Sequence, residues 1–285
     1  MARAGSENFT VASRLLPQRE RAHLLAIYGF ARLTDELGDE LAGDRLAALD
    51  WLQAELDLAY AGSATHPLMV RLAATLSACR LPRAPFVRLI EANRVDQRVS
   101  RYERFEDLLD YCALSANPVG ELVLGVLGIA TRERVALSDR VCTALQLAEH
   151  WQDVAEDHRR GRVYLPLEDM RRFAVDEPQL AAARASSALR SLMAFEVDRA
   201  RDLLAEGQPL VRTLRGRARV ALAGYAAGGW AALAAIEHTD YEVLSGAPRA
   251  SRLRRLTALA RVLASRPGRR PCGDGSRLGS SAASG

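Results

Sequence analysis

The chain has 285 residues, 49% of them hydrophobic, and a formal net charge of +4. This length can bury a sizeable core, so we expect one large domain or two small ones. The charge is too small to indicate a nucleic-acid partner, and none is expected. The four cysteines are isolated, so neither a zinc site nor a disulfide framework is predicted. The start MARAGSENFT has no apolar core typical of a secretory signal, so we expect a cytoplasmic protein.

Helical periodicity dominates the chain, and no segment shows the sustained alternation of a strand. We therefore predict an all-α fold. Pro17 can open a first helix that continues through HLLAIYGFARLTDELGDEL, and Asp44 restarts a second through WLQAELDLAY. Pro67 and Pro85 can each open another helix.

The second half of the chain is also predicted to be helical. The expected helices cover residues 105–114, 118–129, 135–157, 178–206, 208–238 and 249–265. Gly161 ends the helix that carries Asp157, and RVYLP follows it as an extended connection. From Arg266 the chain is mostly Gly, Ser, Pro and Arg, which predicts a disordered tail over 266–285. One domain over 1–265 is therefore expected, with its two acidic helices facing each other.

The longest uncharged run, VALAGYAAGGWAALAAI at 220–236, reaches only the short end of the length needed to cross a bilayer. We interpret it as a buried core helix in preference to a membrane span. Its small side chains would leave room for a long apolar ligand.

Two pairs of aspartates share one spacing: Asp35 with Asp39, and Asp153 with Asp157. Residues at i and i+4 lie on one face of an α-helix, and like charges there destabilise it by a few tenths of a kcal/mol. A compensating cation is therefore expected. Oxygen ligands from two facing helices suit Mg²⁺, which bridges carboxylates to phosphates. The implied substrate is a phosphorylated or diphosphorylated compound.

The first pair continues a polar stripe. Tyr28, Arg32, Asp35 and Asp39 follow one another at helical spacing, so a hydroxyl, a guanidinium and two carboxylates share one side. The alternative is a solvated acidic face on which Arg32 forms an ordinary ion pair with Asp35 or Glu36.

The second pair belongs to a similar stripe, formed with Gln146 and Glu149. Arg162 follows shortly after it, as do Arg159 and Arg160. Guanidinium groups beside metal-binding carboxylates suit a diphosphate leaving group. The alternative for the arginines is a basic turn at the end of a helix, an interpretation that fits Arg159 and Arg160 better than Arg162.

Four segments resemble the squalene/phytoene synthase family. They are NFTVASRLLP at 8–17, AIYGFARLTDELGDE at 26–40, YCALSANPVGELVL at 111–124 and QLAEHWQDVAEDHRRGRVYLP at 146–166. The resemblance reaches to about residue 261 and implies an isoprenoid synthase-type helical bundle with a central cavity. Within the family, the chain is most similar to the HpnC-type hydroxysqualene synthases.

The resemblance implies a reaction in which presqualene diphosphate ionises, the cation rearranges, and water captures it to give hydroxysqualene, with Mg²⁺ as the cofactor. Other hopanoid-pathway enzymes would be partners. Two alternatives remain open: head-to-head condensation of two farnesyl or geranylgeranyl diphosphates, and a non-catalytic relative that acts as a binding subunit.

The resemblance also implies roles for individual residues. The Mg²⁺ and diphosphate ligands would be Asp35, Asp39, Asp153 and Asp157, with Glu149 as a further metal ligand. The leaving group would be surrounded by Tyr28, Arg32, Gln146, Arg162 and Tyr164. The prenyl chains would lie beside Tyr111, Asn117 and Pro118, although Asn117 can equally be a helix cap.

Three positions depart from the family. Glu149 stands where Asn is usual, which adds negative charge beside Asp153. His150 replaces Phe, and we expect it to pack rather than to catalyse; Glu121 stands where Arg is more frequent.

The segment SRLRRLTALARVLASR near the C-terminus has a basic amphipathic pattern. Leu253, Leu256, Leu259 and Leu263 fall on one side and arginines on the other. Such a helix can touch an anionic membrane, or it can be the last helix of the bundle with a solvated face.

Overall fold

A computed structural model describes residues 16–264. Over this range the chain forms helices and no strands, which confirms the all-α prediction. The helices are α2 (Gln18–Asp35), α3 (Arg45–Tyr60), α4 (Pro67–Cys79), α5 (Ala84–Asp96), α6 (Phe105–Ser115), α7 (Asn117–Val126), α8 (Arg132–Gln152), α9 (Val154–Arg159), α10 (Leu167–Arg172), α11 (Glu177–Leu180), α12 (Ser187–Gly207), α13 (Pro209–Arg212), α14 (Gly216–His238) and α15 (Arg252–Ala264). A π-helical turn, η1 (Glu36–Glu40), follows α2. The predicted tail over 266–285 lies outside the described residues.

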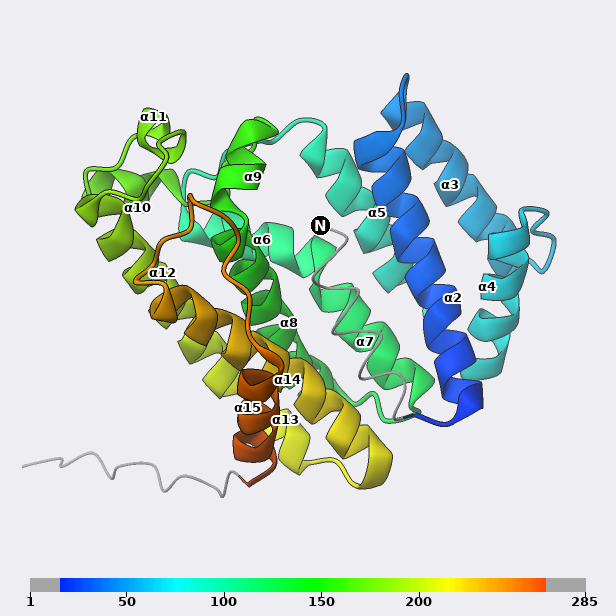
Figure 1. The fold of residues 1–285 in the computed structure, drawn as a ribbon. Coiled ribbons are helices and arrows are strands. Elements are labelled where there is room, and N and C mark those ends of the chain that lie inside the picture. Colours follow the sequence, from blue (N-terminus) through cyan, green and yellow to red (C-terminus); the bar gives the residue numbers. More distant parts are fainter. Residues whose placement is uncertain (1–15, 265–285) are drawn as a thin grey trace, which may run out of the picture.

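Two hydrophobic clusters build the bundle. One joins α2, α3, α4, α5 and α7, and the other centres on α8, α12 and α14. In Figure 1, α2 to α5 form one side of the molecule and α12 to α15 the other, with α6, α7 and α8 between them. Side chains on facing helices can therefore meet near the centre of the bundle.

The predicted helix starts in the first half are confirmed. Pro17 precedes α2, and the Asp44 carboxylate caps α3 by accepting a hydrogen bond of 2.9 Å from the Ala47 backbone N–H. Pro67 is the first residue of α4, and Pro85 lies in the first turn of α5.

Two long helices predicted in the second half are wrong as continuous elements. The 178–206 helix is interrupted between α11 and α12, because the Ser186 hydroxyl caps a new helix by accepting from the Leu189 backbone N–H at 3.1 Å. The 208–238 helix is interrupted between α13 and α14. There Gly216 has φ of +57°, a conformation that favours glycine. Helix propensity alone did not reveal either interruption.

Both acidic pairs lie where regular α-helix ends, contrary to the prediction of two uninterrupted helices. After Asp35 the chain widens into η1, where the Leu41 N–H bonds to the Glu36 carbonyl five residues back at 3.0 Å. Asp153 separates α8 from α9, with φ of −104° and ψ of 15°. The predicted 135–157 helix is therefore two helices.

The apolar run at 220–236 is part of α14. This is the one helix in the described range that is long and apolar enough to cross a membrane, and 61% of its most apolar window is buried in the protein. Its small residues allow close packing: a Cβ on Gly229 would lie 2.9 Å from Leu145 and 3.1 Å from Leu204. Trp230, Ala231 and Ala234 of α14 border a hollow of about 570 Å³ against α15, so there is space beside this helix, and a ligand there stays a prediction.

Candidate active site

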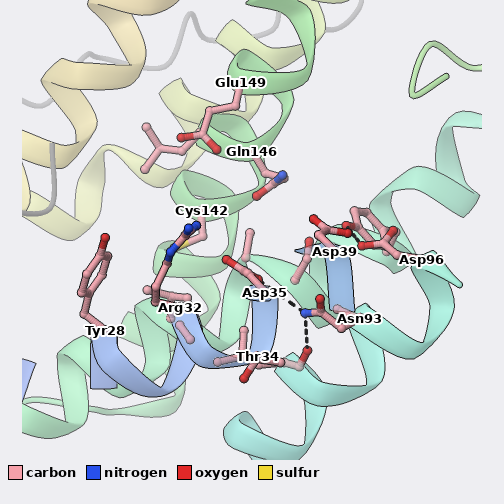
Figure 2. Close-up of a pocket in the computed structure, with 18 of the residues that line it drawn as sticks. Tyr28, Arg32, Thr34, Asp35, Asp39, Asn93, Asp96, Cys142, Gln146 and Glu149 are labelled. Carbon is pink, nitrogen blue, oxygen red and sulfur yellow. Dashed lines mark hydrogen bonds between the residues drawn. The ribbon is translucent and has the colours of Figure 1, made fainter. Parts of the chain in front are cut away.

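A cavity of about 250 Å³ lies between α2, α5, α6, α7 and α8 (Figure 2). Its wall contains seven of the predicted site residues: Tyr28, Arg32, Asp35, Asp39, Tyr111, Gln146 and Glu149. Apolar side chains such as Ile27, Leu89 and Leu145 line the rest. Cavities that hold drug-sized ligands usually measure about 300–1,000 Å³. A long apolar chain therefore requires neighbouring side chains to move.

Asp35, the last residue of α2, points into the space between α2 and α8 (Figure 2). Asn93 of α5 donates its amide to the Asp35 carboxylate at 3.5 Å, a long hydrogen bond. Burial, reinforced by the nearby Asp39 charge, raises the pKa of Asp35 to about 6. The negative charge of Asp35 is therefore only weakly compensated by neighbouring protein groups.

Asp39 is positioned by the π-helical turn and by Arg162. A Cβ on Gly38 would lie 2.1 Å from the Asn93 side-chain oxygen, so this close approach of η1 to α5 requires glycine. Gln97, directly after α5, donates to the Gly38 carbonyl at 2.9 Å and holds the turn. Arg162 then donates to the Asp39 carboxylate at 2.6 Å, which joins the connection after α9 to the first acidic motif.

Arg32 lines the cavity but is also engaged at the surface. It contacts Glu36 at 3.2 Å and Glu40 at 3.0 Å. The ordinary ion pair with Glu36, one of the two interpretations of this arginine, is therefore present. The Arg32 side chain is partly exposed, and exposed ion pairs are weak. Arg32 could therefore leave Glu36 or Glu40 for a bound anion at little cost in free energy.

Asp96 and Asn93 are cavity residues that the sequence did not single out as site residues. The Tyr111 hydroxyl donates to Asp96 Oδ2 at 2.9 Å, whereas the buried Oδ1 has no hydrogen-bond partner. Burial raises the pKa of Asp96 to about 7, although the Arg162 charge opposes the shift. The two residues share one face of α5, but polar residues at this spacing are more often a solvated surface, so the pattern alone did not identify them.

Glu149 faces the cavity from α8, across from Asp35 (Figure 2). Burial raises the pKa of Glu149 to about 7, and the charges of Asp153, Asp35 and Asp157 add to the shift. The pKa of Asp153 is raised to about 6 by burial and by repulsion from Asp157 and Glu156. The carboxylates therefore destabilise one another when all are charged.

Asp153 and Asp157 do not line the central cavity. Asp153 borders a separate hollow of about 260 Å³ between α9 and the segment 243–247. Asp157 lies beside His150, Arg162 and Tyr164. Arg162 therefore connects the two acidic motifs, because it lies beside Asp157 and donates to Asp39.

Tyr164 is buried and stacks on two neighbouring rings. Its ring centroid is 3.7 Å from that of His150 and 5.8 Å from that of Tyr102. His150 thus has the packing role expected of it, and it also contacts Gln146 and Asp157. Arg160, in contrast to Arg162, is exposed and pairs with Glu156 at 2.8 Å, in agreement with the interpretation of a basic turn at the end of a helix.

Asn117 and Pro118 begin α7 and are buried, but neither lines the cavity. Asn117 does not cap a helix, so that alternative is wrong. Its side-chain oxygen accepts a hydrogen bond of 3.0 Å from Thr143 of α8 and fixes α7 against that helix. The substituted Glu121 forms an ion pair with Arg88.

The donor set fits a hard divalent cation that keeps water or phosphate ligands. Within residues 16–264, no three His, Cys, Asp or Glu side chains converge closely enough to hold an ion by themselves. The cavity wall instead carries three carboxyl groups with raised pKa values, those of Asp35, Asp96 and Glu149. Mg²⁺ suits such a site because it usually takes one or two carboxylates and completes its shell with water and substrate phosphates.

Comparisons with known proteins agree with this geometry. The family model for squalene/phytoene synthase matches residues 2–255. The chain is 48% identical to the squalene synthase HpnC from Alicyclobacillus acidocaldarius, whose crystal structure superposes with a TM-score of 0.79 over 82% of this chain and 89% of that one.

Two curated relatives carry different activities. A hydroxysqualene synthase from Rhodopseudomonas palustris is 35% identical over 73% of this chain and 72% of its own length. A 15-cis-phytoene synthase from Synechococcus elongatus is 34% identical over 75% of this chain and 74% of its own length. The all-helical bundle, the cavity carboxylates and these matches lead to one conclusion: the chain belongs to the squalene/phytoene synthase family.

Proposed function

We propose that this protein converts presqualene diphosphate to hydroxysqualene with Mg²⁺ as cofactor. The carbon–oxygen bond to the diphosphate breaks, the cation rearranges, and water adds with loss of a proton. The products are the alcohol, diphosphate and one proton. No reductant is consumed.

The observation that carries the proposal is a largely apolar cavity whose wall also carries carboxylates, one of which, Asp39, accepts a hydrogen bond from Arg162. Similarity to the squalene synthase HpnC and to hydroxysqualene synthases supports the choice of substrate. Hopanoid-pathway enzymes would supply the substrate and use the product.

Each group has a distinct task in this proposal. Asp35, Asp39, Glu149, Asp153 and Asp157 would supply the carboxylate ligands for Mg²⁺, one or two to each ion. The bound Mg²⁺ would neutralise the charge that develops on the diphosphate. Arg162 and Arg32 would donate to diphosphate oxygens, and the apolar wall would limit water to the molecule that captures the cation.

The test is incubation of the purified protein with presqualene diphosphate, with Mg²⁺ or with EDTA, followed by product extraction. We expect Mg²⁺-dependent release of diphosphate together with hydroxysqualene. If neither diphosphate nor hydroxysqualene were formed, the proposal would be overturned.

A second candidate uses the same site for head-to-head condensation of two farnesyl or geranylgeranyl diphosphates. Similarity to 15-cis-phytoene synthase favours it. Incubation with each diphosphate alone distinguishes the two functions, because only the condensing enzyme forms a C30 or C40 product from them.

A non-catalytic binding subunit is the remaining alternative. Asp153→Asn should abolish turnover if the protein is an enzyme, and should leave partner binding intact if it is not. The retention of both acidic pairs favours the enzyme.

We also propose that the protein is cytoplasmic and that α15 brings it to an anionic membrane surface. Leu259 and Leu263 pack toward the core, whereas Leu253 and Leu256 are 71% and 63% exposed. Arginines flank them, and no acidic residue occurs between Glu242 and Asp274. Exposed leucines among arginines suit an anionic lipid surface.

Co-sedimentation of the full chain with vesicles tests this surface. Binding should require phosphatidylglycerol in addition to phosphatidylcholine, and Leu253→Ser with Leu256→Ser should abolish it. The matched pair Leu25→Ser with Val70→Ser, also exposed, should bind normally. Equal binding by both double variants would contradict the proposal.

A further inference from the structure

His150 lies inside the bundle, one turn of α8 beyond Gln146. It is 4% exposed. Its ring stacks on Tyr164 with the two planes 18° apart, which restricts rotation of the imidazole. Its two nitrogens therefore point at defined neighbours.

The neighbours determine which nitrogen carries the hydrogen. His150 Nε2 lies 3.1 Å from the amide nitrogen of Gln146. That amide nitrogen can only donate, so His150 Nε2 must accept and carries no hydrogen. In the neutral ring the hydrogen is then on Nδ1, which faces Asp157 Oδ2 at 3.8 Å.

This contact also orients Gln146. An amide has one nitrogen end and one oxygen end, so directing the nitrogen toward His150 directs the oxygen elsewhere. In Figure 2 the oxygen of Gln146 is the end nearer to Asp35. Gln146 therefore adds a neutral oxygen donor to the carboxylates of the cavity wall, in the donor class that hard cations and their water ligands take.

We propose that His150 is a positioning residue: as the Nδ1–H tautomer, with Nδ1 on the side of Asp157, it accepts a hydrogen bond from the Gln146 amide and holds the Gln146 oxygen toward the cavity. What that oxygen binds, Mg²⁺ or a water bound to it, rests on the proposed function. The tautomer and the amide orientation do not. His150 touches no reacting atom and acts through Gln146. Outer partners of this kind typically change metal affinity about 10–100-fold when they are removed.

The tautomer is measured directly by ¹⁵N NMR of the histidine side chains in the whole protein without ligands. Replacing His23, His66, His158 and His238 one at a time assigns the remaining signal to His150. We expect the hydrogen on Nδ1. A hydrogen on Nε2, or a doubly protonated ring at neutral pH, would overturn the proposal, and this readout needs no activity and no change at His150.

The link to Gln146 is tested by a double-mutant cycle with Mg²⁺ and inorganic pyrophosphate as the probe. His150→Phe keeps an aromatic ring against Tyr164 and removes both nitrogens. It should weaken pyrophosphate binding about tenfold in the parent and less than about twofold in Gln146→Leu, because the residue through which it acts is gone. Equal losses in both backgrounds would contradict the proposal.

The two measurements separate the two claims. If the parent binds no Mg²⁺ and pyrophosphate, the proposed function fails, and the NMR tautomer alone decides the role of His150. If the parent binds them but His150 has its hydrogen on Nε2, the positioning role fails while the proposed function stands.

Discussion

The two acidic motifs have the same spacing but different supports. Asp35 and Asp39 line the central cavity, and both have fixed partners, Asn93 and Arg162. Asp153 is the break between α8 and α9, Asp157 lies within α9, and Asp153 borders a hollow next to the loop 243–247 outside the cavity lining. One motif is thus built into the cavity wall, while the other lies outside it, with Asp157 beside Arg162. A spacing of four residues does not by itself give two equivalent metal sites.

The largest effects are expected from removing one charge in each motif. Asp35→Asn and Asp153→Asn should each lower kcat about 100-fold or more, because lost electrostatic stabilisation of a leaving group has this magnitude. Steady-state release of diphosphate measures the effect. If Asp153→Asn retained parental kcat, the second motif would not take part in the reaction.

Arg162 joins the two regions, so its removal should be the next most damaging change. Arg162→Gln loses the contact with Asp39 and one donor to the diphosphate, and kcat/KM should fall about tenfold to 100-fold. Arg160→Gln is the matched control, since that arginine is exposed and pairs only locally with Glu156. Equal losses in the two variants would contradict a special role for Arg162.

Gly38 tests the support of the first motif without changing its charge. Gly38→Ala places a Cβ against the Asn93 side chain, and the free energy of unfolding should fall by about 1–3 kcal/mol. Gly29→Ala is the control, because its Cβ would lie 3.2 Å from the flexible end of Leu68. Denaturant unfolding measures both, and equal losses would show that the η1 contact is not tight.

The smallest effect is a pH dependence of stability in the absence of Mg²⁺. Folding raises the pKa of Glu149 to about 7 and that of Asp35 to about 6, so the folded state binds more protons than the unfolded state. Stability should therefore fall as the pH rises from about 4 to 7. Thermal unfolding should show a decline of a few degrees, reduced in Glu149→Gln and reversed by Mg²⁺. If stability fell with pH as much in Glu149→Gln as in the parent, Glu149 would not be a source of the pH dependence.

Much of the fold could be predicted because its signals are local. Pro17, Asp44 and Pro67 mark helix starts through backbone geometry and capping, which the sequence displays directly. The breaks before Ser187 and Gly216 were missed, because alanine-rich flanks favour helix and the competing signals are a single cap and a single positive φ.

The candidate site could be predicted only in part. Tyr28, Arg32 and the first aspartate pair form a pattern along one helix, and the structure places all of them at one cavity. Asp96, at the end of α5, lies at that cavity because of tertiary packing, which no local sequence pattern predicts. The π-helical turn at Glu36–Glu40 was also missed, because it depends on the contact of Gly38 with Asn93.

The origin of the alcohol oxygen tests the central claim most directly. Presqualene diphosphate is incubated with the protein and Mg²⁺ in H₂¹⁸O, and the extracted product is analysed by mass spectrometry. Breakage of the carbon–oxygen bond followed by capture of water predicts hydroxysqualene that carries ¹⁸O. An alcohol with unlabelled oxygen would show cleavage at phosphorus and would contradict the account, as would a hydrocarbon product without oxygen.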